Sequence, residues 1–308
     1  MLSTIPYEVP PSLLSGLSGD PTPTVVVGAN TAIVLESVKA AVDAGLIKPI
    51  LVGEPDLINK AATEVGFGFE NAHVVPAFSE EETAQKGVKI ASDGEAGIVM
   101  KGHIHTDVLI RAALSKTDGL RCGRRFTHVS HLTIPGDPKV LILTDPAVNV
   151  LPDAPTRMDM VRNSVDLARA IGIARPKVAM LSAVEIVNPG MPSSVAAKET
   201  VDAFNASGED QGFDIAGPFA FDNAISPEAA RIKGVNNPVA GQADIIVSPN
   251  IETANAIGRI MVNFMSAVLA GVVMGAKVPF VLTSRADPAE ARLASIALAR
   301  KISEYQAG

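Results

Sequence analysis

Three polar residues, Thr283, Ser284 and Arg285, follow directly on the apolar run 278–282. A short apolar run of this kind is typical of a strand buried on both faces of a parallel sheet. The two hydroxyls can donate hydrogen bonds, and a guanidinium presents a planar fork of N–H groups that matches phosphate oxygens. The segment therefore indicates a site for an anion, phosphate above all.

A helix pattern begins immediately after this turn. Asp287 is a candidate cap, Pro288 suits the first helical position, and Glu290 stands where the acid of a capping box belongs. The N–H groups at a helix N-terminus and the helix dipole favour a negative charge nearby. The same turn could equally be structural, and Asp287 suits the role of helix cap as readily as that of proton acceptor.

The elements that must position this turn are indicated by strand and helix patterns that alternate through the first hundred residues. We expect strands at 24–27, 49–53, 73–75 and 97–101, each followed by a helix pattern. This alternation predicts a parallel sheet with helices on both faces. Ligands bind outside the carboxyl ends of the strands in such sheets, so the turn after 97–101 is a second candidate for the site.

His105, Thr106 and Arg111 lie in or after that turn. They are candidates for binding phosphate, although Arg111, on an expected helix, could instead form an ion pair with an acid. His103 and His105 have a spacing that could ligate a metal in a strand. Because no Cys stands beside them, we expect no metal site.

The pattern changes after residue 118. Two apolar runs, 127–134 and 139–144, are separated by Pro-Gly-Asp-Pro, which predicts an antiparallel pair. Further strand and helix patterns follow, and the last strand and helix resemble the first part of the chain. We therefore predict a discontinuous first α/β domain, residues 1–118 with 277–308, and a second α/β domain, residues 119–276. The polar residues that could line a cleft or cap helices in the second domain are Asn149, Asp222, Glu252 and Asn255.

Composition limits the classes of function. The net charge of −7 and the scarcity of aromatic residues argue against a nucleic-acid partner. The single cysteine, Cys122, excludes an internal disulfide and suits a reducing compartment. Residues 1–23 do not have the pattern of a signal peptide, and the apolar stretch 256–276 contains polar residues, which indicates a buried helix rather than a membrane span. We expect a cytoplasmic protein without a membrane partner.

Several motifs, in this order and spacing, resemble the phosphate acetyl/butyryltransferase family. They are Gly102–Thr106 with Arg111–Leu114, Thr144–Asn149, Gly217–Ser226, Pro238–Asp244, Pro249–Asn255 and Thr283–Asp287. The resemblance extends over about residues 20–305. It implies a two-domain α/β fold with parallel and mixed sheets like that of the isocitrate and isopropylmalate dehydrogenases, an active site in the cleft between the domains, and a homodimer.

The resemblance also implies an activity. The family moves a short acyl group, acetyl or butyryl, between coenzyme A and inorganic phosphate, and we expect direct attack of the thiolate with both substrates bound. Coenzyme A is then a substrate, and no bound cofactor is expected. Ser284 and Arg285 match the Ser-Arg pair of the family, and Asp287 is the nearest candidate for its downstream acid. The candidates for contacts with phosphate or coenzyme A are His105, Thr106, Arg111, Asn149, Asp222, Glu252, Asn255 and Thr283.

Two other functions stay open. One is a nicotinamide-dependent dehydrogenase of similar fold, against which the first strand–helix turn lacks the G-x-G-x-x-G pattern and no acid cluster suits a divalent metal. The other is a relative that binds coenzyme A or an acyl phosphate without catalysis. Release of free thiol from coenzyme A esters, dependent on phosphate, would distinguish the three.

Overall fold

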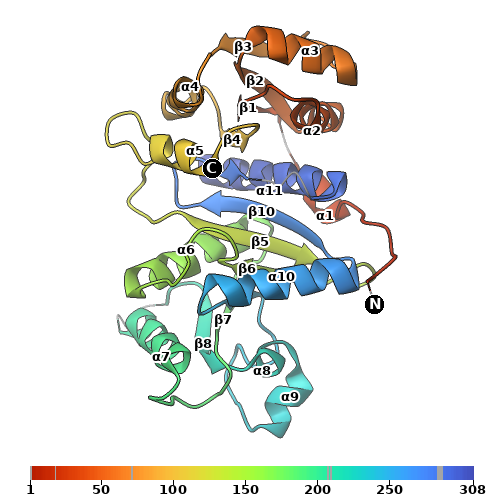
Figure 1. Ribbon diagram of the computed structural model, residues 1–308. Helices are drawn as coiled ribbons and strands as arrows, with labels where there is room; N and C mark the ends of the chain where they lie inside the picture. Colours follow the sequence, from red (N-terminus) through yellow and green to blue (C-terminus); the bar gives the residue numbers. More distant parts are fainter. Residues whose placement is uncertain (1, 18, 71, 207, 209, 283–286) are drawn as a thin grey trace. The chain divides into compact units, whose positions relative to one another are not determined.

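The computed structural model describes residues 2–17, 19–70, 72–206, 208, 210–282 and 287–308. The chain divides into two compact units (Figure 1). Unit 1 consists of residues 1–6 and 125–269, and unit 2 of residues 7–124 and 270–308. The domain boundaries predicted from the sequence, after residues 118 and 276, lie near two boundaries of the units. The prediction assigns residues 1–6 to the domain that corresponds to unit 2, whereas they belong to unit 1. Whether the units are folding domains stays a prediction.

Unit 2 is built on a sheet whose strands lie in the order β3-β2-β1-β4-β11-β10. Its strands are β1 (Thr22–Val27), β2 (Ile47–Gly53), β3 (His73–Pro76), β4 (Ile98–Lys101), β10 (Val268–Met274) and β11 (Phe280–Val281). The first five in spatial order are parallel, and β10 is antiparallel to β11. The apolar run of β1 is fully buried from Val25 to Val27, as expected of a central parallel strand.

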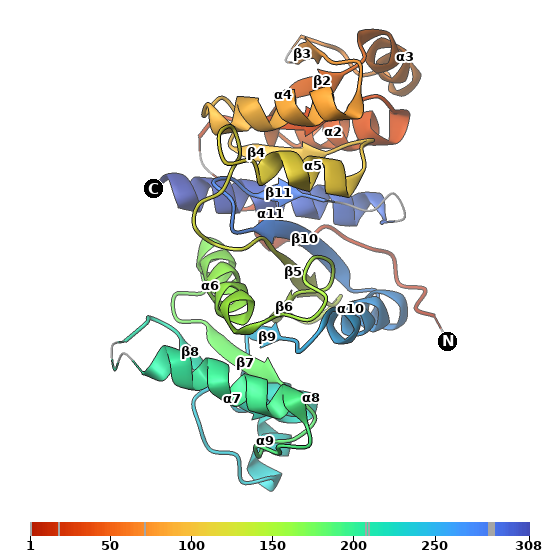
Figure 2. The same ribbon diagram turned by 60° about the vertical axis from the view of Figure 1, so that its left-hand side comes forward.

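Helices cover both faces of this sheet, as the alternating pattern predicts. They are α1 (Pro11–Leu14), α2 (Ala32–Asp43), α3 (Pro55–Val65), α4 (Glu80–Ser92), α5 (Thr106–Ala113) and α11 (Ala289–Ala307). Figure 2 shows α4 and α5 in front of the sheet and α2 and α11 behind it. Gly66 ends α3 in the left-handed conformation, with φ of 62°, which glycine adopts without steric cost.

Unit 1 has a mixed sheet in the order β5-β6-β9-β7-β8. Its strands are β5 (Thr127–Thr133), β6 (Val140–Thr144), β7 (Lys177–Leu181), β8 (Asp214–Phe219) and β9 (Ile245–Val247). The β5–β6 pair is antiparallel, which confirms the prediction from the Pro-Gly-Asp-Pro turn, and the other pairs are parallel. Both units therefore show the predicted α/β class, with a mixed sheet overall.

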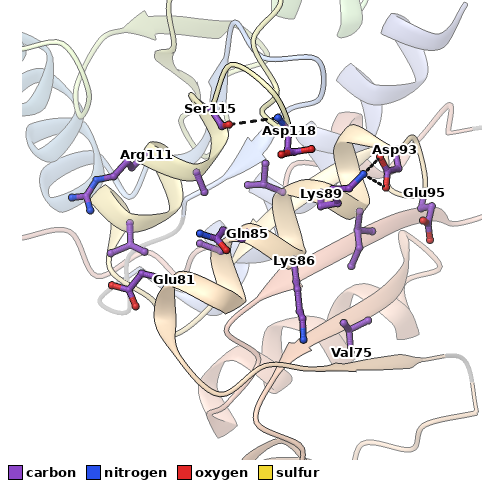
Figure 3. Close-up of a pocket in the computed structure, with 15 residues that line it drawn as sticks. Val75, Glu81, Gln85, Lys86, Lys89, Asp93, Glu95, Arg111, Ser115 and Asp118 are labelled. Atoms are coloured by element: carbon purple, nitrogen blue, oxygen red, sulfur yellow. Dashed lines mark hydrogen bonds and ion pairs between the residues drawn. The ribbon is translucent and has the colours of Figure 1, made fainter.

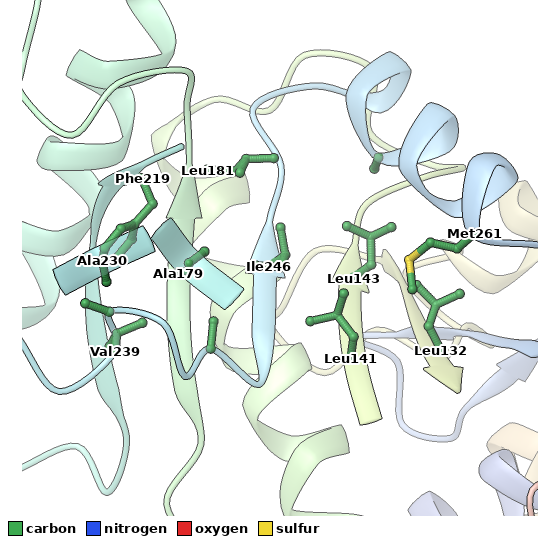
Figure 4. Close-up of a cluster of buried hydrophobic side chains, with 14 of the residues drawn as sticks. Leu132, Leu141, Leu143, Ala179, Leu181, Phe219, Ala230, Val239, Ile246 and Met261 are labelled. Atoms are coloured by element: carbon green, nitrogen blue, oxygen red, sulfur yellow. The ribbon is translucent and has the colours of Figure 1, made fainter. Parts of the chain in front are cut away.

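The helices of unit 1 are α6 (Ala154–Ala170), α7 (Pro192–Asn205), α8 (Phe221–Ile225), α9 (Pro227–Ile232) and α10 (Ile251–Met265). One face of the sheet carries a buried apolar cluster that includes Leu132, Leu143, Ile246 and Phe219, and Met261 of α10 closes it (Figure 4). This cluster fixes the strands whose carboxyl ends carry the polar residues of unit 1.

The prediction of one buried helix over 256–276 is right in secondary structure only for residues 256–265, and Ile260 and Phe264 in that part are more than half exposed. The helix α10 begins earlier, at Ile251, and ends at Met265, where Ser266 adopts a left-handed conformation with φ of 50°. The residues that follow, Val268–Met274, form strand β10. Their β-branched side chains favour a strand, and burial on both faces makes the run uniformly apolar, so the two elements merge into one hydrophobic stretch in the sequence.

Candidate active site

Three strands of unit 2 end at one edge of its sheet. The strand β11 pairs in parallel with β4, with Val281 opposite Met100, and β4 pairs in parallel with β1, with Lys101 opposite Val27. The segments that leave these strands therefore start side by side, at the edge where open α/β sheets bind ligands. The turn after β11 contains Thr283, Ser284 and Arg285, which lie outside the described residues.

Two glycines bring the exits of β1 and β4 into direct contact. The amide of Gly102 donates to the carbonyl of Val27 at 2.8 Å, and the amide of His103 donates to the carbonyl of Gly28 at 2.7 Å. Gly28 has φ of 84°, and a Cβ on Gly102 would lie 2.2 Å from the Gly28 carbonyl oxygen. The turn that leads to His105 is thus fixed against its neighbour by backbone contacts that exclude side chains.

His105 is held by a carboxylate from another element. Its Nδ1 lies 2.8 Å from each carboxylate oxygen of Glu80, in the first turn of α4. The imidazole is 77% exposed. Glu80 and His103 line a cavity of about 160 Å³ at the carboxyl edge of the sheet, together with Asn30 and Glu54. His105 thus contacts a residue that lines a cavity in the region where a ligand is expected.

The other two candidates after β4 lie on α5. Thr106 is the first residue of the helix and is exposed. Arg111, in the last turn, has a 74% exposed side chain whose Nη2 lies 3.3 Å from Asp107 Oδ2. It lines a groove of about 840 Å³ between α4 and α5, drawn in Figure 3. The structure thus shows the surface ion pair that the sequence left open for Arg111, and a contact with phosphate stays a prediction.

Asp287 is not the cap of the last helix. The N-cap residue of α11 is Pro288, and the helix begins at Ala289, so the capping assignment made from the sequence is wrong by one residue. The carbonyl of Asp287 accepts a hydrogen bond of 2.7 Å from Arg292 Nη1, and Arg292 Nε donates to Ser37 Oγ on α2 at 2.9 Å. The backbone at Asp287 is therefore tied to two helices of unit 2.

In unit 1, the carboxyl end of β6 carries a buried carboxylate. Asp145 is 1% exposed, and its two oxygens accept N–H groups of His128, Ala147, Val148 and Asn149 at 2.9 to 3.3 Å. The side-chain amide of Asn149 also donates to Asp145 at 2.7 Å and to the carbonyl of Phe126 at 2.9 Å. Asn149 thus has a structural role in this loop, whatever it contacts in addition.

The remaining candidates of unit 1 follow β8 and β9. Asp222 is exposed in the first turn of α8 and accepts the amide of Asn223 at 2.9 Å. Glu252 is exposed in the first turn of α10, and Asn255 Nδ2 donates to the carbonyl of Pro146 at 3.3 Å. Asn149 and Asn255 therefore both donate hydrogen bonds to the loop after β6, Asn149 to Asp145 and Asn255 to the next residue, Pro146. The contacts of all four with substrate stay predictions.

Two residues of these edges were not singled out from the sequence. Glu80 precedes His105 by 25 residues, and no spacing rule connects them. Asp145 stands in one of the quoted motifs, after a predicted strand and in a segment polar enough to face a cleft, but its burial and its hydrogen bonds depend on the folded loop. Among the described residues, no three His, Cys, Asp or Glu side chains gather as metal ligands would, and no helix is long and apolar enough to cross a membrane.

The chain matches the model of a known protein family. The family model described as Phosphate acetyl/butaryl transferase matches residues 77–300. The chain belongs to this family. Membership confirms the predicted family and, with it, an enzyme of the phosphate acyltransferase class.

Individual members of the acyltransferase family are similar to nearly the whole chain. The phosphate acetyltransferase of Rhizobium meliloti is 42% identical, over 84% of this chain and 82% of its own. The phosphate butyryltransferase of Clostridium acetobutylicum is 40% identical, over 86% of this chain and 88% of its own. The structure of a branched-chain phosphotransacylase from Enterococcus faecalis V583 has a TM-score of 0.81 at 32% identity, covering 91% of this chain and 99% of that one.

The fold extends beyond the acyltransferase family. The structure of 4-hydroxythreonine-4-phosphate dehydrogenase from Klebsiella pneumoniae has a TM-score of 0.57 and covers 92% of this chain and all of that one. At 12% identity this likeness concerns the fold alone.

Proposed function

We propose that the protein transfers a short acyl group reversibly between coenzyme A and inorganic phosphate. The observation that carries this proposal is the similarity of the chain, at 42% and 40% identity, to a phosphate acetyltransferase and a phosphate butyryltransferase over more than four-fifths of each. The acyl group is acetyl or butyryl. Because one methylene changes discrimination by only ~1–3 kcal/mol, both esters are tested.

The reaction needs a thiolate, a place for the phosphate and support for a developing oxyanion. In the direction of acyl-CoA synthesis, the sulfur attacks the carbonyl carbon of the acyl phosphate, the carbon–oxygen bond to phosphate breaks, and phosphate leaves. Arg285 supplies positive charge for the phosphate, and Ser284 and Thr283 donate hydrogen bonds to it or to the carbonyl oxygen. Their place in the chain, shortly after β11, supports this assignment because β11 pairs in parallel with β4, and β4 pairs in parallel with β1.

The two-domain arrangement of the dehydrogenases, with the active site in a cleft between domains, belongs to the same proposal. The likeness of the fold to a dehydrogenase structure supports the arrangement, and the division into two units is consistent with it. His105, Thr106 and Arg111 then contact substrate from unit 2, and Asn149, Asp222, Glu252 and Asn255 from unit 1. The active protein is a homodimer, which sedimentation or light scattering would test.

The decisive experiment measures free thiol released from acetyl-, propionyl- and butyryl-CoA with and without inorganic phosphate. The proposal requires release that depends on phosphate and yields one acyl phosphate for each thiol. A chelator in the assay should leave the rate unchanged, and nicotinamide absorbance should not change with any of the esters. Thiol release that is independent of phosphate, or none with any ester, would refute the proposed reaction.

Direct attack also predicts the kinetic pattern. With both substrates bound together, initial rates should follow a ternary-complex pattern, and no acylated peptide should appear by mass spectrometry. The variant Ser284→Ala should lower kcat by ~10²-fold or more and change KM less, because a donor to the transition state acts on the chemical step. A stoichiometric acyl group on Ser284 would replace direct attack with a covalent mechanism.

A further inference from the structure

We propose that His105, oriented by Glu80, takes the proton from the thiol of coenzyme A. This assignment rests on the proposed acyl transfer and supplies the proton acceptor that the reaction needs. The sequence offers Asp287 for that role, whereas the structure offers a histidine already held by a carboxylate.

The geometry of the pair is that of a base and the group that orients it. Glu80 lies 2.8 Å from Nδ1 of His105 through both of its oxygens, which favours the tautomer with the proton on Nδ1. The other nitrogen, Nε2, then carries a lone pair. Within the described part of the chain, Nε2 has no hydrogen-bond partner, so it is available to a substrate. A histidine with one nitrogen fixed and the other open has the arrangement that general bases require.

The position of the pair agrees with this role. His105 follows the glycine contact that fixes the β4 exit against the β1 exit, and Glu80 lines the cavity at the same edge. The strand β11, which leads to Ser284 and Arg285, leaves the sheet beside β4. An exposed ion pair elsewhere on the surface contributes little to stability. This pair instead lies at the exit of β4, the strand that pairs with β11.

The chemistry favours an imidazole over a carboxylate. An ordinary thiol titrates near 8.5, an ordinary imidazole near 6.5 and an ordinary aspartate near 3.9, on typical values, so proton transfer from thiol to imidazole is much less unfavourable. Nε2 accepts the thiol proton as the sulfur attacks the acyl carbon. The imidazolium then gives that proton to the departing phosphate or to water. In the reverse reaction the imidazolium protonates the leaving thiolate, so the residue returns to its starting state in each cycle.

The charges around His105 come from three elements. Glu80 on α4 faces it directly, and Glu54, after β2, lines the same cavity. On its own turn and helix the neighbours are His103 and Asp107, and the carboxylate of Asp107 is paired with Arg111. Both signs of charge are therefore present, because Lys101 at the end of β4 places its Nζ 3.5 Å from the carbonyl of Gly102, and the carboxylate in contact with the imidazole is that of Glu80.

The test compares pH profiles of kcat/KM for the parent, His105→Gln and Asp287→Asn. In the parent, phosphate-dependent thiol chemistry should fall on the acid side as the base is protonated. In His105→Gln we expect kcat to fall by ~10²-fold or more, with the KM for phosphate little changed, and the acid limb to be replaced by a rate that tracks ionisation of the thiol itself. Asp287→Asn should keep the acid limb.

Two further variants and two controls complete the design. Glu80→Gln keeps a hydrogen-bond acceptor but loses the charge, so it should shift the acid limb to lower pH and lower kcat less than His105→Gln does. Added imidazole should restore part of the rate of His105→Ala. The matched controls are His73→Gln, at the exposed first residue of β3, and Glu81→Gln, at the neighbour of Glu80 on α4. Both variants should behave as the parent.

Two results would overturn the assignment. One is an unchanged acid limb in His105→Gln, and the other is loss of that limb in Asp287→Asn alone. Either would leave the acyl transfer of the parent intact, so the failure of this assignment is distinguishable from failure of the proposed function. Absence of phosphate-dependent thiol chemistry in the parent would instead remove the reaction itself. Melting temperatures near that of the parent would show that the variants are folded.

Discussion

The interior of unit 1 contains a histidine that should make the protein sensitive to acid. His131, on β5, is 1% exposed, and burial lowers its pKa from 6.5 to about 4. Among the described residues, neither ring nitrogen has a hydrogen-bond partner. The His131 ring therefore binds a proton near pH 6.5 in the unfolded chain but only near pH 4 in the folded chain. The free energy of unfolding falls as the pH drops through this range.

The size of the effect follows from the two pKa values. Above pH 6.5 the ring is neutral in both states and contributes no pH dependence. Below it, each pH unit removes about 1.4 kcal/mol from the free energy of unfolding, so the loss is about 2 kcal/mol at pH 5 and levels off near about 3.4 kcal/mol below pH 4. The variant His131→Leu has no ring to protonate and should lack this term.

The assay is urea denaturation of the parent and His131→Leu between pH 7.5 and 5. Both proteins contain the same carboxylates, so their contribution to the pH dependence of the free energy of unfolding cancels in the difference. We expect the variant to gain about 2 kcal/mol on the parent over this range. The exposed His73→Gln is the control and should follow the parent. A constant difference between His131→Leu and the parent at every pH would show that His131 is not buried as a neutral ring.

Three further predictions concern single side chains. Asp145→Asn places an amide NH₂ against N–H groups that donate hydrogen bonds to the Asp145 carboxylate, and should lower the free energy of unfolding by ~3 kcal/mol in urea denaturation. A loss under ~1 kcal/mol would contradict the buried network. Arg285→Ala should lower kcat by ~10²-fold or more in the thiol assay with little change in melting, and Arg285→Lys should recover only part; full activity in the alanine variant would remove Arg285 from the mechanism. Arg300→Leu removes the guanidinium that donates hydrogen bonds to the carbonyls of Gly45 and Leu46. Because Arg300 is only 4% exposed, these carbonyls lose their partner and the melting temperature should fall. An unchanged melting temperature would contradict this role.

The sequence predicts the regular parts of the fold because they depend on local rules. Alternating strand and helix patterns give the parallel sheet of unit 2, and Gly45 and Gly66 end helices in left-handed conformations, with φ of 68° and 62°. The prediction for 256–276 fails because β10, buried on both faces, is an apolar run without a period, and exposed apolar residues of α10 such as Ile260 and Phe264 extend that run. There the division into α10 and β10 depends on tertiary packing and on the conformation of Ser266.

The candidate site is predictable only in part for a related reason. Sequence position indicates which turns reach the carboxyl edge, and His105 lies in one of them. It does not indicate which side chains meet there, since Glu80 comes from the preceding strand–helix unit. Arg111 illustrates the opposite case, because a local partner four residues away, Asp107, already accounts for its charge.

The placement of β11 has a consequence for how the molecule is made. The strand lies between β4 and β10, and β4 belongs to the first hundred or so residues, yet all of unit 1 is translated before β11. During synthesis, one edge of β4 stays unpaired until all of unit 1 has been translated and β11 follows. Unpaired strand edges promote aggregation. A messenger truncated after unit 1 would yield a product with this edge exposed, and residues 277–308 supplied as a separate peptide would have a defined slot to fill.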